Sequence, residues 1–156
     1  MSLETSSDYA RLACLSLKLP SMPVMVNPAI ANARAVRDER GARIEWSHIF
    51  LATLGHFEVL AVTGHEVAHH YLWSKQAAGE TIAAELHERL ADVVSGWLAA
   101  RTSIVLGREG LARLARALNL LPAGAYAGSG DRLRDLLHGW SNGTLAAPPL
   151  VLVNRP

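Results

Sequence analysis

One short segment of the chain carries residue types that can bind a metal ion and move a proton. Positions 65 to 69 read His-Glu-Val-Ala-His, an H-E-x-x-H pattern. Residues four apart lie on one face of a helix, so the imidazoles of His65 and His69 can reach a single ion. Glu66 then lies close enough to touch a water molecule at that ion. The segment predicts a metal site with a carboxylate base, and the alternative is a pair of structural histidines on a helix.

A third protein ligand is required, because a catalytic zinc site has three protein ligands and one open position. The acids Glu85, Glu88 and Asp92 follow in the next predicted helix. When two helices run back to back, the helical rise places Glu88 between the levels of the two histidines, with Glu85 beyond the metal. Asp92 falls level with His65 and can accept its free ring N–H, which fixes the tautomer that binds metal.

The elements that must position these residues are mostly helical. Half of the residues are hydrophobic, with alanine and leucine dominant, which favours helices. The spacing of apolar residues predicts helices over 5–17, 47 to about 75 with a break at Gly55, 80–100, 111–120 and 131–140. β-branched residues alternate with others and predict a hairpin of strands 33–37 and 42–46. We therefore expect a helix-rich α+β fold.

Length and composition limit the organisation and the function. A chain of 156 residues is one domain, 1–156, in which we expect the first helix (1–22) and an extended tail (141–156) to be peripheral. The net charge of +1 gives no basic surface for nucleic acid. Cys14 is the only cysteine, which excludes a disulfide scaffold and a cysteine zinc site. No apolar run is long enough for a membrane helix or a signal peptide. We expect a cytoplasmic protein, with an anchor before position 1 as the alternative.

The histidine motif and the acidic motif together resemble those of a known family. H-E-x-x-H followed by E-x-x-A-D at 88–92 is similar to the gluzincin zinc metallopeptidases. The bacterial neutral zinc metallopeptidases match more tightly, with H-E-x-x-H-H at 65–70 and E-x-x-A-D-x-x-x-G at 88–96. The stretch 129–139 also looks like the final helix of that family. The resemblance covers about 27–139, and the chain departs from it in lacking an N-terminal anchor, in its shorter length and in having Ala68 where many members carry glycine.

The resemblance implies a zincin-like minimal metallopeptidase domain, with a small hairpin or sheet over the active-site helix. Zn²⁺ would be held by His65, His69 and Glu88, and Glu66 would act as the general base in metal-assisted hydrolysis of a peptide bond. A peptide or protein substrate would lie extended beside the strand near 31–36. A plain edge strand is the alternative there.

The residue that stabilises the developing oxyanion stays open. Possible donors are Arg132, Arg134, His138, Tyr126 and Tyr71. We favour helix-surface charges for the two arginines and a partner of the tail for His138. The remaining histidines and the tryptophans are interpreted as packing, exposed or clamp residues, namely His48, His56, His70, His87, Trp46, Trp73, Trp97 and Trp140.

Three functions compete at this point. The first is a zinc-dependent endopeptidase of the gluzincin type. The metzincin variant is excluded, because Lys75 stands where its third histidine is required. The second is a zinc-binding interaction or regulatory module with little or no turnover, and the third is a helical domain with coincidental histidines. Glu66 favours the enzyme, since a module that only binds has no chemical need for a carboxylate between the histidines.

Overall fold

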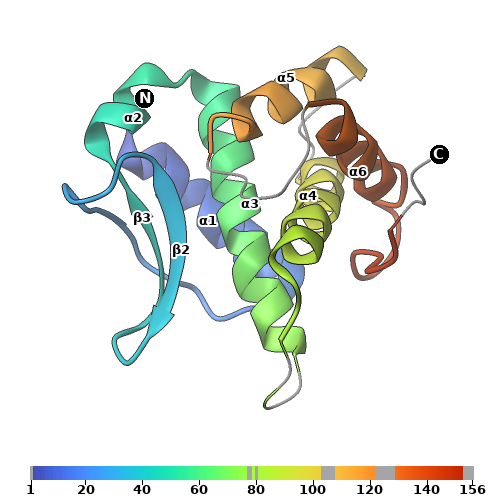
Figure 1. Ribbon diagram of the computed structural model, residues 1–156, viewed down its shortest axis with the longest axis horizontal. Helices are drawn as coiled ribbons and strands as arrows, with labels where there is room; N and C mark the ends of the chain where they lie inside the picture. Colours follow the sequence, from blue (N-terminus) through green and yellow to red (C-terminus); the bar gives the residue numbers. More distant parts are fainter. Residues whose placement is uncertain (1, 77–78, 80, 103–107, 122–128, 153–156) are drawn as a thin grey trace.

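The computed structural model describes residues 2–76, 79, 81–102, 108–121 and 129–152, which form a series of helices and strands (Figure 1). Their bounds are α1 (Leu3–Leu17), β1 (Val24–Val26), β2 (Ala33–Asp38), β3 (Gly41–Trp46), α2 (His48–Thr53), α3 (His56–Lys75), α4 (Ala84–Arg101), α5 (Arg108–Leu118) and α6 (Ser129–Ser141). The chain thus has the helix-rich α+β fold that the sequence predicts.

The first helix is bounded by local hydrogen bonds. The Ser2 hydroxyl accepts a hydrogen bond from the Thr5 N–H at 3.3 Å and caps the start, so the helix begins two residues before the predicted Thr5. Lys18 closes the end in the left-handed conformation, with φ 55°, and its N–H donates to the Leu15 carbonyl.

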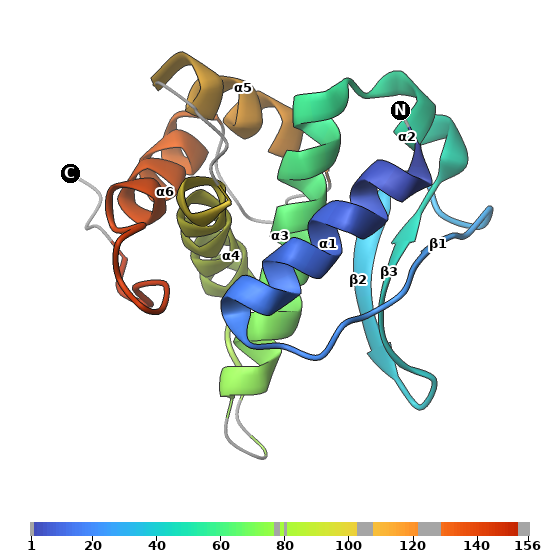
Figure 2. The ribbon, with the colours of Figure 1, turned by 180° about the vertical axis from the view of Figure 1, so that it is seen from behind.

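α1 lies across α3 and belongs to the core (Figure 2). Ala13 is 0% exposed. The Ser6 hydroxyl is hydrogen-bonded to the Thr63 hydroxyl at 2.7 Å and accepts a hydrogen bond from the Trp46 indole at 2.9 Å. These contacts tie α1 to α3 and β3, although the sequence placed residues 1–22 at the periphery.

The predicted hairpin is confirmed, and a third strand joins it. β2 and β3 pair antiparallel, from Ala33 opposite Trp46 to Asp38 opposite Gly41. β1 pairs in parallel with the other side of β3, giving the order β1-β3-β2. The sequence analysis missed β1, because three residues are too few for a visible alternation. β2 is therefore an edge strand, and it packs against α3.

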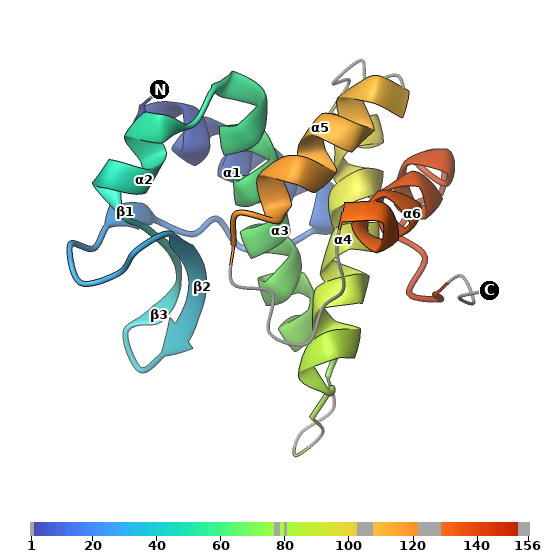
Figure 3. The ribbon, with the colours of Figure 1, turned by 45° about the horizontal axis from the view of Figure 1, so that its top comes forward.

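α2 and α3 are separated at Gly55, where the sequence predicts a break. The Ser47 hydroxyl caps α2 by accepting a hydrogen bond from the Phe50 N–H at 3.4 Å. α1, α4, α5 and the sheet all pack around α3, which is the central helix (Figures 1 and 3). Every residue of α3 from Val59 to Leu72 is buried, so the H-E-x-x-H segment lies inside the molecule.

α4 runs back along α3, as predicted, but begins at Ala84 instead of Glu80; residues 77–78 and 80 lie outside the described part. α6 crosses α4 so closely that two glycines are required. A Cβ at Gly96 would collide with the backbone of Leu136 on α6, and a Cβ at Gly139 with the backbone of Val93 on α4. α6 is thereby held against the helix that carries the predicted acidic ligands.

The end of the chain folds back onto α4. The Trp97 indole donates a hydrogen bond to the Leu145 carbonyl at 3.2 Å, and Pro148 is buried. The predicted tail is thus docked at Leu145, Pro148 and Leu152, although it begins with turns after α6 and is otherwise largely exposed. Most of the predicted loop between α5 and α6 (122–128) lies outside the described residues. Within the described part, none of the helices is long and apolar enough to cross a membrane.

Candidate metal centre

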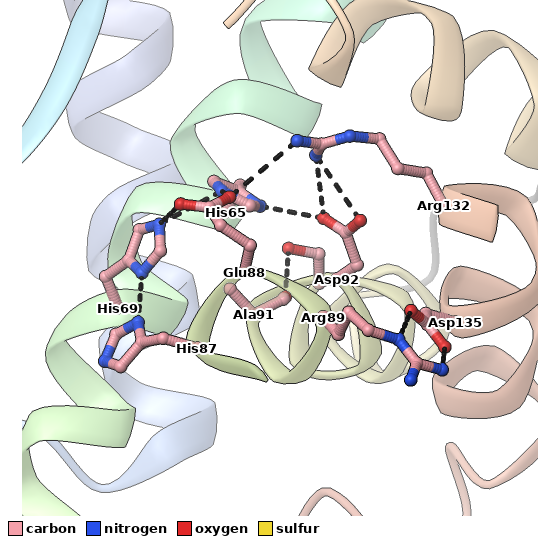
Figure 4. Close-up of polar contacts among 10 residues, drawn as sticks. His65, His69, His87, Glu88, Arg89, Ala91, Asp92, Arg132 and Asp135 are labelled. Atoms are coloured by element: carbon pink, nitrogen blue, oxygen red, sulfur yellow. Dashed lines mark hydrogen bonds and ion pairs between the residues drawn. The ribbon is translucent and has the colours of Figure 1, made fainter. Parts of the chain in front are cut away.

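Three side chains from two helices bring a ligand atom each to one point between α3 and α4 (Figure 4). His65 Nε2 lies 3.0 Å from His69 Nε2 and 3.0 Å from Glu88 Oε2. His69 Nε2 lies 3.3 Å from Glu88 Oε1. The predicted juxtaposition of these three residues is therefore found in the tertiary structure. Glu85, the rival acid, is exposed and outside this cluster.

Helix geometry explains why the atoms meet. His65 and His69 are one turn apart on the buried α3, so both rings leave the helix on the same side. α4 packs along that side and brings Glu88 level with the gap between the rings. The helical rise alone was enough to anticipate this register, since both helices are regular here.

Asp92 occupies the predicted position behind His65. Its Oδ1 lies 2.9 Å from His65 Nδ1, and the aspartate is 0% exposed. Because an ionised carboxylate only accepts, Asp92 fixes a proton on His65 Nδ1 and turns Nε2 of the ring toward the centre.

Arg132 is a buried partner of this centre and not the helix-surface charge that we favoured. It is 0% exposed on α6, and its guanidinium donates to Asp92 Oδ1 at 3.1 Å and Oδ2 at 3.3 Å. The same group lies 3.7 Å from Glu88 Oε2. The surface interpretation was wrong because the position of α6 against α4 depends on the two glycine contacts, which periodicity does not reveal.

The electrostatics of the centre favour a bound positive charge. Burial disfavours the charged form of His65, but its contacts with Asp92 and Glu88 outweigh burial and raise its pKa to about 10. Burial acts against ionisation of Glu88 too, yet the contacts with His65 and His69 hold the pKa of that carboxyl well below its ordinary value. A proton shared by the imidazoles balances the negative charge of the nearby carboxylates, and so does a cation held by the same atoms.

His87 is part of the centre, although the sequence analysis found no partner for it. Its Nδ1 lies 2.7 Å from His69 Nδ1, and its side chain lines the same cavity as the ligands. Burial, followed by the neighbouring His69, lowers the pKa of His87 to about 4. Trp73 lies beside both rings, with centroids 6.1 Å from His69 and 5.6 Å from His87. The available signal was the position of His87 directly before Glu88 on one helix.

Glu66 faces the cavity and is fixed by the edge strand. The Ala35 N–H donates a hydrogen bond to Glu66 Oε2 at 2.7 Å, and the glutamate is 4% exposed. This contact holds one carboxylate oxygen and leaves the other free to accept a proton. No side-chain pattern could have predicted it, because the donor is a backbone group of β2.

The residues present fit a zinc ion. Two imidazole nitrogens and one carboxylate oxygen form a ligand set typical of catalytic zinc, in which neighbouring ligand atoms lie about 3.3 Å apart. The observed separations of 3.0 to 3.3 Å are close to that value. The three ligands and Glu66 border a cavity of about 530 Å³, which leaves an open side for water and substrate. Its other walls are residues 32–35 of the β2 edge and Trp73, Ile82, Ala84, His87 and Leu121.

The other predicted donors lie away from this cavity or outside the described part. Arg134 pairs with Asp131 at 3.8 Å on the helix surface, and Tyr71 lines a different cavity. The backbone carbonyl of His138 accepts from Asn142 at 2.8 Å, while its ring does not line the cavity. Tyr126 lies outside the described residues.

The remaining histidines and tryptophans mostly have the packing roles predicted for them. His70 Nε2 contacts the Arg43 carbonyl at 2.9 Å, and His48 and His56 are exposed. Trp46 and Trp97 are buried in the core, Trp140 packs against it, and Trp73 forms a wall of the cavity.

Comparison with known proteins adds no relative: no protein family, curated protein or solved structure matches the chain. The geometry of the centre is therefore what bears on the function.

Proposed function

We propose that this chain is a zinc-dependent endopeptidase of the gluzincin type, built on a zincin-like domain. One observation carries the proposal: His65, His69 and Glu88 converge on one point, and the carboxylate of Glu66 borders the same open cavity. Zinc binding alone requires the first three residues. A carboxylate that is held beside them at the cavity wall adds the group that hydrolysis needs.

The residues of the chain have distinct roles in this reaction. Zinc held by His65, His69 and Glu88 would activate the attacking water and polarise the peptide carbonyl. Glu66 is held at Oε2 by the Ala35 N–H, so Oε1 takes the proton from the attacking water. After the carbon–nitrogen bond breaks, Glu66 returns that proton to the leaving amine. Asp92 keeps the His65 ring in its metal-binding tautomer.

The edge of β2 offers a place for an extended peptide. The Ala35 N–H, which is bonded to Glu66, points away from β3, so the backbone groups of Ala33 and Arg37 on the same side face the outer edge of the sheet. Residues 32–35 also line the cavity that holds the ligands. A substrate that adds to this edge as a further strand would bring its backbone past Glu66.

The test compares zinc content and peptide cleavage in matched variants. Glu66→Gln keeps an oxygen for the Ala35 N–H but removes the base, so it should retain one zinc ion by elemental analysis and lose roughly 10²- to 10⁴-fold in turnover of a mixed peptide substrate. His69→Ala should lose the zinc. Glu58→Gln, elsewhere on α3, should match the wild type in both assays.

Each outcome separates the candidate functions. Unchanged turnover in Glu66→Gln would remove the mechanism. A wild-type protein that binds zinc and cleaves no peptide would be a zinc-binding module. A wild-type protein that binds no zinc would leave a helical protein with a buried histidine cluster.

A further inference from the structure

We propose that His87 is a positioning residue for the metal ligand His69: it accepts the Nδ1 proton of His69 and so holds that ring with Nε2 toward the ion. This inference rests on the proposed zinc site. The role falls to the residue directly before the ligand Glu88, which lies outside the H-E-x-x-H motif.

The geometry of the two rings is that of a direct hydrogen bond. His69 Nδ1 and His87 Nδ1 are 2.7 Å apart, and the ring planes differ by only 12°. The ring centroids are 4.8 Å apart, close to the nitrogen separation plus the two ring radii. The rings therefore lie edge to edge with their Nδ1 atoms facing each other, as a hydrogen bond requires, and not face to face.

Counting protons gives the direction of this bond. A neutral imidazole has one N–H and one lone pair. If His69 Nε2 gives its lone pair to an ion beside His65 and Glu88, its proton is on Nδ1 and must be donated to His87. His87 then accepts at Nδ1 and carries its own proton on Nε2.

The two ligand histidines are thus held by unlike partners. His65 donates to Asp92, a carboxylate that also pairs with Arg132. His69 faces a second imidazole, His87, which is 8% exposed and lies beside Trp73. Since His87 and Glu88 are consecutive on α4, one helical turn supplies both a ligand and the partner of another ligand.

The experiment uses two variants of nearly equal size. His87→Asn retains an acceptor for the His69 N–H, whereas His87→Leu has the same branching and no acceptor. Zinc affinity is measured by competition with a chromophoric chelator, and the absorption spectrum of the Co²⁺-loaded protein reports the arrangement of the ligands. The wild type and His56→Ala, at an exposed histidine of α3, serve as controls.

We expect His87→Leu to bind zinc ten- to hundredfold more weakly than the wild type, and His87→Asn to recover most of that loss. The Co²⁺ spectrum should change in His87→Leu and stay close to wild type in His87→Asn. Equal affinities for the two variants would overturn the inference while leaving the zinc site intact. Absence of zinc from the wild type would overturn both, and a loss confined to His87→Leu in a protein without peptidase activity would support the inference alone.

Discussion

Asp92 and Arg132 form an ion pair in which each residue is 0% exposed. Such a pair adds little net stability, because the cost of removing two charges from water offsets their attraction, but the loss of one partner leaves a buried charge uncompensated. Asp92 has a second task, since it also accepts the His65 N–H. A second ion pair, Arg89 with the buried Asp135 at 3.1 Å, links the same two helices away from the ligands.

Replacing Asp92 by Ala should therefore have two separable effects. Zinc affinity should fall roughly ten- to hundredfold, because the His65 ring loses its orienting acceptor. The metal-free protein should also lose about 3–5 kcal/mol in the free energy of unfolding, because the buried Arg132 loses the carboxylate that accepts two of its hydrogen bonds. Asp135→Ala is the matched control, with a similar loss of stability and wild-type zinc affinity. Zinc titration and urea unfolding distinguish the two, and an unaltered titration for Asp92→Ala would remove its assigned role.

At the level of elements, α6 is part of the site although it supplies no ligand. It delivers Arg132 to Asp92 and Glu88, and Figure 4 shows the guanidinium reaching across to α4. That reach depends on the close crossing of the two helices at Gly96 and Gly139. Side chains at this crossing would separate the helices and withdraw Arg132 from the carboxylates.

The substitution Gly139→Ala tests this dependence. Its Cβ would collide with the Val93 backbone, so the protein should lose about 1–3 kcal/mol, despite the better helix propensity of alanine, and Tm should fall by roughly 3–10 °C. Zinc affinity should fall with it. Gly55→Ala, where the nearest atoms to the added Cβ belong to the end of the Glu58 side chain and not to backbone, should change the free energy of unfolding by less than about 1 kcal/mol. Wild-type zinc affinity in Gly139→Ala would show that α6 does not support the site.

At the scale of the whole molecule, a second charged network lies in the sheet that packs on α3. Glu45 on β3 is 5% exposed and accepts hydrogen bonds at 2.9 Å from Asn27, Arg34 and Arg43. Arg43 also pairs with Asp38 at 2.8 Å. This network joins the loop after β1 to both strands of the hairpin, and so supports the edge strand that holds Glu66.

The network should make stability depend on pH. Burial acts to raise the pKa of Glu45, but its three hydrogen bonds outweigh burial and lower it from 4.5 to about 2. Because the pKa is lowered on folding, the contribution is complete above about pH 4.5 and disappears as the pH falls through about 2. Glu45→Gln should therefore destabilise the metal-free protein by about 1–3 kcal/mol at pH 7, after allowance for the half-exposed Arg34.

Urea unfolding in EDTA at pH 7, 5 and 3 measures this contribution. The difference between Glu45→Gln and wild type should be constant from pH 7 to 5 and smaller at pH 3. Glu39→Gln, at an exposed position in the hairpin turn, should show little difference at any pH. A Glu45→Gln difference that grows on acidification would contradict the assignment.

Local rules were enough to predict the helices, the hairpin and the core of the site. The spacing of His65 and His69 is a property of one helix, and the level of Glu88 and Asp92 follows from two regular helices that run back to back. The break at Gly55 and the cap at Ser47 were predictable for the same reason, since each depends on a few neighbouring residues.

Contacts between distant segments were decided only by the tertiary structure. The burial of Arg132 depends on two glycine crossings, and the bond from Ala35 to Glu66 depends on which side of a strand faces α3. The pairing of His69 with His87 depends on how α4 is rotated about its own axis, because a shift of one residue would place a different side chain opposite His69. By itself the sequence determined which side chains could form the site, because helix periodicity is local. The three-dimensional packing determined which groups orient them, because those partners come from elements whose relative placement has no local signal.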